Sequence, residues 1–314
     1  MSSRRSRFPD VLAALGVAAL LFSATPARAQ ACCAGGSAVT PARLAMHDMA
    51  LVGVEAKAGA VLGSYDAAGH TVAPPPGAHE ADLEQDVFAA ARVFRRGQIA
   101  LLVPFVETWR SSQGQSEAGG GIGDVNASAR YDFTLAGMSA IVPGIAVVAG
   151  VTFPTGRPAD ASGIGALATG ATGVGAWQFN VGVAFEQTFG PWLVNITGIV
   201  AERTARTVGS GVTAVHERLA PQWTTLVAAA YTFPNDWAVA LSAAYALEGD
   251  ATIDGVEFPA TAHRLPTLAL SGLAPLSDVW RLQGALYDNP PIPQVGLNQP
   301  ADAGVSLTLV RSWM

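Results

Sequence analysis

The sequence carries little charge and almost no lysine. Asp, Glu, Lys and Arg make up 13% of its 314 residues, and Lys57 is the only lysine. The formal net charge is −6. Proteins that bind nucleic acid present a basic patch or stripe, and this sequence has none. We therefore expect no nucleic-acid partner.

Long apolar runs are also missing after the N-terminal leader, although 50% of the residues are hydrophobic and the mean hydropathy is +0.32. No such segment reaches the roughly 18 apolar residues that a transmembrane helix needs. Apolar residues spread over alternating positions are typical of a membrane β-barrel, because lipid-facing residues occupy every second position of each strand.

Cysteine is scarce, with only Cys32 and Cys33. Thiolates can bind Cu(I) or Zn, but no companion ligands flank this pair. Lipidation of Cys32 would favour a leucine at position 29, where the sequence has Ala29. A disulfide between adjacent cysteines is strained. We favour an exported leader without a site, so Cys32 and Cys33 are weak metal candidates and no cofactor is expected.

The N-terminus has the three parts of a secretory signal peptide. Arg4, Arg5 and Arg7 form a basic region, residues 11–22 are apolar, and Ala27-Arg28-Ala29 matches a cleavage site. The expected organisation is a signal peptide (1–29), a short periplasmic segment (30–48) and a barrel (49–314). The Arg4-Arg5 pair also fits twin-arginine export, but that route carries folded cargo, and general secretion suits a barrel better.

A hairpin over residues 175–200 shows the strand pattern most clearly. Trp177, Phe179, Val181, Val183 and Phe185 alternate with polar or small residues, and the pattern resumes after a turn ending at Pro191. Period-two alternation around a short turn predicts two antiparallel strands. Further strands are expected over residues 49–62, 83–94, 99–110, 124–133, 141–153, 223–233, 237–248, 264–273, 279–287 and 303–313. The strand over 99–110 is apolar on both faces in its first half, which leaves its orientation open.

Long and short connections alternate along this whole series. Outer-membrane barrels have short periplasmic turns, longer extracellular loops and an even strand number. We therefore predict an all-β fold, a transmembrane antiparallel up-and-down barrel of about 12 strands in the cell outer membrane. Tryptophans and tyrosines near strand ends fit aromatic girdles. Residues Val305 to Trp313 are similar to the C-terminal signal read by the barrel-insertion machinery, an expected partner beside outer-membrane lipid and a small-molecule solute.

Polar residues on the face opposite the apolar one are expected to line the lumen. Their functional role would be to set the charge preference of a path, and the competing interpretation, which we favour, is that they pair to brace a narrow barrel. The candidates are Glu55, Lys57, Glu84, Asp86, Arg92, Asp124, Asn126, Arg130, Asp132, Asn180, Glu186 and Arg281.

Three segments resemble a known family. Gly121–Tyr131 has the form G-x-G-D followed by Arg-Tyr, Gly150–Gly156 ends in Pro-Thr-Gly, and Thr172-Gly173-Val174-Gly175 precedes the hairpin. Over about residues 120–250 the chain resembles the outer-membrane barrel family of the meta-pathway of phenol degradation. The resemblance implies a channel for aromatic or other hydrophobic compounds, distantly akin to fatty-acid uptake barrels, and not an enzyme.

The function expected from the sequence is passage of small solutes, hydrophobic or aromatic ones among them. One alternative is a structural or adhesive surface barrel in which the long loops act. A barrel lipase is a weaker alternative, because it needs a serine beside a histidine and no serine motif accompanies the five histidines. His70 and His79 flank acids in a predicted loop, where a solvated loop is favoured over a metal site.

Overall fold

The structure is a computed structural model that describes residues 43–209 and 214–314. The predicted signal peptide and Cys32-Cys33 lie outside the described residues. Within the described ranges, no helix is long and apolar enough to cross a membrane.

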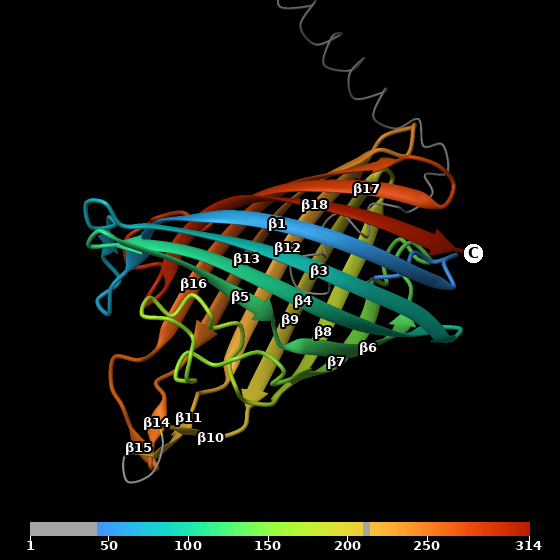
Figure 1. The fold of residues 1–314 in the computed structure, drawn as a ribbon. Helices are drawn as coiled ribbons and strands as arrows, with labels where there is room; N and C mark the ends of the chain where they lie inside the picture. Colours follow the sequence, from blue (N-terminus) through green and yellow to red (C-terminus); the bar gives the residue numbers. More distant parts are fainter. Residues whose placement is uncertain (1–42, 210–213) are drawn as a thin grey trace, which may run out of the picture.

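Twelve long antiparallel strands form a closed barrel (Figure 1). Each pairs with its neighbour in sequence, and the last pairs with the first, from Ala50 opposite Trp313 to Ser64 opposite Pro300. The predicted fold class is therefore confirmed. The barrel strands are β1 (Ala50–Tyr65), β3 (His79–Phe94), β4 (Gly97–Ser112), β6 (Val125–Thr134), β7 (Gly144–Phe153), β8 (Gln178–Phe189), β9 (Trp192–Arg203), β12 (Gln222–Thr232), β13 (Ala238–Glu248), β16 (His263–Pro275), β17 (Trp280–Asp288) and β18 (Pro300–Trp313).

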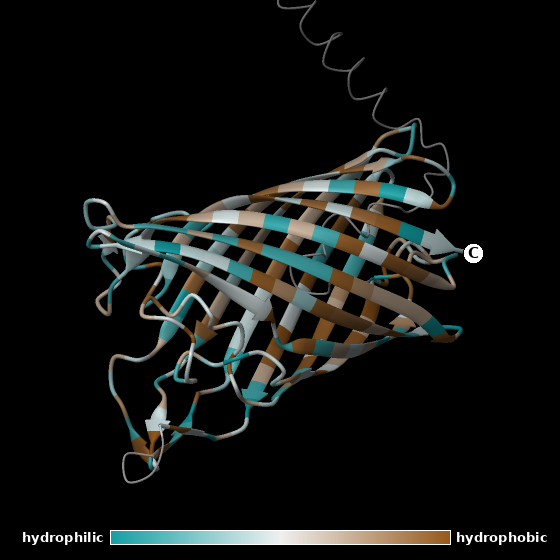
Figure 2. Cartoon of the chain, in the orientation of Figure 1, coloured by the Kyte–Doolittle hydropathy of each residue, from teal (hydrophilic) through white to brown (hydrophobic). Residues whose placement is uncertain are grey.

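The outer wall is apolar because exposure alternates along each strand. In β13, Val239 and Leu241 are 43% and 63% exposed, whereas Ala238 and Ala240 are buried. All seven tryptophans are exposed. Hydrophobic residues recur along the barrel strands in Figure 2. A closed barrel with an apolar outer face is the β-structure that satisfies every backbone group within lipid, and this fold places the chain in an outer membrane.

Aromatic side chains cluster at the end of the barrel that carries the short turns. Tyr231 makes edge contacts with Trp192 and Phe233, with ring centroids 5.0 Å and 4.9 Å apart. Arg311, which interrupts the apolar face of β18, lies over the rings of Trp280 and Trp313. The charge of Arg311 thus lies among aromatic rings at the end of a strand. This position corresponds to the membrane interface, where amphipathic side chains are favoured.

The structure corrects the prediction in the loops. Between the strands predicted over 99–110 and 124–133, the chain continues β4 to Ser112, turns tightly and forms a further strand, β5 (Gln115–Ile122), which pairs with the outer half of β4. Two other predicted loops contribute to a small sheet of β10 (Arg206–Val208), β11 (Val215–Arg218), β14 (Thr252–Ile253) and β15 (Val256–Glu257). A further short strand, β2 (Thr71–Val72), pairs with the end of β1.

The orientation of β4, which the sequence left open, is now defined. Ile99, Leu101 and Trp109 are exposed, whereas Gln98 and Thr108 are buried. Even-numbered residues of β4 therefore face the lumen. The short-turn end, where Ala50 and Trp313 pair, is periplasmic by the rule for such barrels, and the long-loop end is extracellular.

Candidate functional site: the barrel lumen

The inner face of the barrel gathers the polar residues that the sequence pattern grouped together. The predicted residues on strands occupy the positions that alternate with exposed apolar side chains, and Asp124 lies between β5 and β6. Neighbouring strands also bring them into register. Glu55 is opposite Asp86, Lys57 is opposite Glu84, and Glu186 is opposite Asn195.

Near the periplasmic end, an ion-pair network lies on the inner face of β6, β8 and β9. Arg130 Nη2 is 3.0 Å from Glu186 Oε1 and 2.9 Å from Asp132 Oδ1. Glu186 also accepts hydrogen bonds from Arg43 and from Asn195 Nδ2, the latter at 3.0 Å. Glu186 is buried, and the guanidinium groups of Arg43 and Arg130 compensate its charge. Three of the predicted lumen residues, Arg130, Asp132 and Glu186, are therefore joined by ion pairs.

The segment 43–49 occupies the periplasmic mouth. The Leu44 backbone N–H donates to Gln98 Oε1 at 3.1 Å, and the Leu44 side chain is buried. Arg92 donates to the carbonyls of Asp48 and Ala45 at 3.0 Å and 2.8 Å. Arg281 pairs with the Asp48 carboxylate. Arg92 and Arg281, predicted to line a path, therefore hold this segment, which lies beside a cavity of about 330 Å³.

The extracellular half of the lumen is polar and uncharged on one wall. A cavity of about 270 Å³ lies against β6, β7, β8, β9 and β12. Asn126 Nδ2 donates to Thr152 Oγ1 at 2.9 Å, and Gln178 donates to Asn180 at the same distance. The side chains around this cavity that carry amide or hydroxyl groups are Asn126, Ser128, Thr152, Gln178, Asn180, Gln222 and Thr224.

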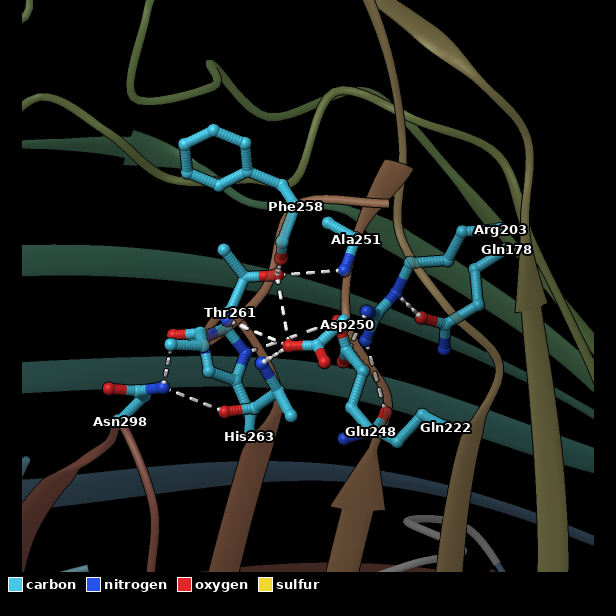
Figure 3. Close-up of polar contacts among 12 residues, drawn as sticks. Gln178, Arg203, Gln222, Glu248, Asp250, Ala251, Phe258, Thr261, His263 and Asn298 are labelled. Atoms are coloured by element: carbon cyan, nitrogen blue, oxygen red, sulfur yellow. Dashed lines mark hydrogen bonds and ion pairs between the residues drawn. The ribbon is translucent and has the colours of Figure 1, made fainter. Parts of the chain in front are cut away.

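An arginine organises the extracellular end of the lumen (Figure 3). Arg203 pairs with Glu248 at 2.6 Å and donates to Gln178 and Gln222 at 2.8 Å and 3.1 Å. His263 Nδ1 lies 3.9 Å from Glu248. This cluster joins β8, β9, β12, β13 and β16 into one polar rim above the cavity.

The extracellular loop 154–177 folds against the inner face of β4 and β5. Arg110 Nη1 donates to the Leu167 carbonyl at 3.0 Å, and Glu117 accepts from the Leu167 N–H at 2.6 Å. Asp124 accepts from the N–H groups of Gly156 and Val174 at 2.9 Å and 2.7 Å. Asp124, a predicted lumen residue, is thus an anchor for this loop.

Several residues of the site were not among the lumen candidates predicted from the sequence. Arg43, Asp48, Asn195, Arg203 and Glu248 all take part in the contacts described above. Arg203 and Glu248 fall at strand ends, where the alternating pattern fades, and Arg43 and Asp48 precede the first strand. Asn195 lies on the inner face of β9 opposite Glu186, and only the strand register reveals that contact.

The described residues hold no group of three or more His, Cys, Asp or Glu side chains placed to bind a metal ion. His70 Nδ1 lies 3.1 Å from Asp66 Oδ2, and His216 contacts Thr207 at 3.4 Å. The weak metal candidates Cys32 and Cys33 lie outside the described part.

A known protein family matches most of the barrel sequence. Residues 64–274 match the model of the family described as "Putative MetA-pathway of phenol degradation". The chain belongs to this family. The resemblance inferred from three short motifs is therefore confirmed, over a longer stretch than those motifs covered. Among proteins with curated functions, none matches the chain by sequence.

Solved structures share the fold of this family member. The chain is similar to the COG4313 outer membrane channel from Pseudomonas putida F1, with a TM-score of 0.69 and 16% identity over 85% of this chain and 96% of that one. It is also similar to the translocator domain of the autotransporter NalP from Neisseria meningitidis, with a TM-score of 0.50 and 10% identity over 97% of this chain and 98% of that one. At these identities the likeness establishes the barrel fold alone.

Proposed function

We propose that the protein is a passive outer-membrane channel for small solutes that carry a single aromatic ring with polar substituents. The observation that carries the proposal is the cavity of about 270 Å³ in the extracellular half of the lumen, beside the Arg203 cluster. Pockets that bind drug-sized ligands have volumes of about 300–1,000 Å³, so this cavity suits a smaller molecule. Its amide and hydroxyl groups can donate to and accept from a ring hydroxyl.

The family supports the aromatic assignment, since its description refers to phenol degradation. One relative by fold is described as an outer membrane channel. We further infer that the protein transports without catalysis, because His70 and His263 lie beside carboxylates and His216 beside a threonine. A lipase needs a histidine that contacts a serine in addition to a carboxylate.

Liposome swelling tests the proposal. The refolded chain would be reconstituted, and influx measured for a pentose, a hydroxybenzoate and a two-ring analogue, none of which crosses bare lipid quickly. We expect the hydroxybenzoate to enter faster than the pentose, and the two-ring solute to be excluded. No solute-dependent swelling, with folded protein in the vesicles, would contradict the proposal.

A matched pair of variants locates the path. Thr224→Arg introduces a long side chain into the cavity and should abolish the influx, because Thr224 lines it. Thr225→Ser alters the neighbouring residue on the exposed face of β12 and should leave influx unchanged.

A further inference from the structure

One group of lumen acids differs from the others in having too few cations beside it. Elsewhere, Glu80 pairs with Arg110, Glu186 with Arg130, and Glu248 with Arg203. On the wall formed by β1 and β3, four carboxylates follow one another along the inner face, and Lys57 is the basic side chain that the register places among them. We call this group the acidic stripe; it consists of Glu55, Asp82, Glu84 and Asp86.

The strand register forces two of these carboxylates together. Glu55 lies directly opposite Asp86, whereas Glu84 lies opposite Lys57 and Asp82 opposite Gly59. Directly opposed residues on adjacent antiparallel strands have Cβ atoms about 4.5–5.5 Å apart, and like charges there are destabilising. The barrel therefore carries a local repulsion that a neutral pair at these positions would lack.

Hydrogen bonds from the protein satisfy part of the stripe. Thr108 Oγ1 donates to Asp82 at 2.6 Å, and the hydroxyls of Ser306 and Thr308 interact with Glu55. Asp86 is only 8% exposed, yet its Oδ1 has no hydrogen-bond partner among the described residues. Buried polar atoms without a partner are rare in folded proteins because each carries a desolvation penalty. A donor from a bound solute would remove that penalty at Asp86 Oδ1.

Lys57 is poorly placed to donate a hydrogen bond to every carboxylate of the acidic stripe. Its Nζ lies 5.1 Å from the centroid of the Tyr287 ring, on the side of the lumen toward β17. A single ammonium also cannot neutralise four carboxylates. A second positively charged group would both offset the repulsion between Glu55 and Asp86 and supply the missing hydrogen bond.

We propose that the acidic stripe is a binding site for a primary ammonium group carried by a solute in the lumen. An ammonium has three N–H donors, which suits an unpartnered carboxylate oxygen beside a second carboxylate. A chelated metal ion is a poorer fit, because the described residues bring no three metal-ligating side chains together. The site lies on the wall formed by β1 and β3 and does not require the pore to conduct.

The experiment measures the thermal unfolding midpoint of the refolded full chain at one near-neutral pH. Methylammonium chloride would replace tetrabutylammonium chloride in steps, so that the ionic strength stays constant. A parallel series would use sodium chloride in place of methylammonium chloride. We expect a saturable rise in the midpoint with methylammonium and a smaller one with sodium. Tetrabutylammonium has no N–H donor and serves as the screening reference.

Variants of the stripe make the test specific. Asp86→Asn and, independently, Glu55→Gln should each raise the half-saturating methylammonium concentration by about tenfold or more, the loss expected for one charge-assisted hydrogen bond. Both should be at least as stable as the parent chain without methylammonium, since the repulsion is gone. Glu257→Gln, an equal charge change on an extracellular loop, should respond like the parent.

Three results would overturn the proposal. They are an equal effect of sodium and methylammonium, an unchanged response in both stripe variants, and a marked loss of stability on neutralising either acid. Swelling assays report on conduction separately, so failure of this site and failure of the channel are distinguishable.

Discussion

Arg281 Nη2 lies 2.5 Å from Asp48 Oδ2, and this buried ion pair joins β17 to the segment 43–49 across 233 positions of sequence. Arg92 reinforces the attachment through two backbone carbonyls of the same segment. The periplasmic mouth is therefore narrowed by the chain's own N-terminal portion, which the barrel wall holds through arginines.

Breaking that ion pair should loosen the segment. We expect Arg281→Ala to lower the free energy of unfolding by about 3 kcal/mol, because it leaves Asp48 charged and buried without its partner. Trypsin cleavage after Arg43 should also accelerate. The control is Arg264→Ala, which removes an exposed arginine of β16. Equal cleavage rates in parent and variant would show that the pair does not hold the segment.

Removing the charge of Glu186 while keeping its shape should weaken the ion-pair network around it. Glu186→Gln keeps the side-chain volume but removes the charge that compensates Arg130 and Arg43. We expect a destabilisation of about 3 kcal/mol, as for a broken buried pair. Urea unfolding followed by tryptophan fluorescence measures it. Glu257→Gln, on an extracellular loop, should stay within about 0.5 kcal/mol of the parent, and a comparably small effect at Glu186 would argue against a bracing role.

The two faces of β12 should tolerate arginine differently. Val227 is 45% exposed on the outer wall, near the middle of its strand. Val227→Arg should destabilise the barrel by about 2–4 kcal/mol, the range for arginine facing the bilayer midplane. Thr224→Arg faces the lumen and should be much less disruptive to folding. Unfolding in lipid vesicles compares them, and similar losses in the two variants would mean that the faces are wrongly assigned.

The period-two pattern predicted the strands and their faces because lipid and lumen impose opposite demands on alternate residues. It could not reveal the inward-folded segments, whose contacts join residues far apart in sequence. Asp124 was placed on the lumen face, yet its role depends on backbone N–H groups of Gly156 and Val174. The segment 43–49 has no periodicity at all, and its position depends on Arg92 and Arg281.

β5 was missed for a different reason. Its centre, Gly119-Gly120-Gly121, reads as a flexible loop, since glycine weakens strands. In the structure, a Cβ at Gly119 would lie 2.7 Å from the Thr169 carbonyl carbon. Glycine is therefore required there by the close approach of loop 154–177, which no local pattern discloses.

The single lysine gives a direct probe of lumen access. Lys57 carries the only side-chain amine of the chain and lies on the inner face of β1. We expect a small water-soluble acylating reagent to modify Lys57 in the folded, reconstituted protein, as detected by mass spectrometry of the peptide that contains it. Lys57→Arg provides the blank. Modification after unfolding but none in the folded barrel would mean that solutes of that size do not reach the lumen.

Single-channel recording in planar bilayers tests the central claim most directly. The refolded full chain should produce discrete openings, and Thr224→Arg should abolish them because it fills the cavity in the extracellular half of the lumen. Absence of openings from folded, inserted protein over a wide range of voltages and salt concentrations would contradict the channel.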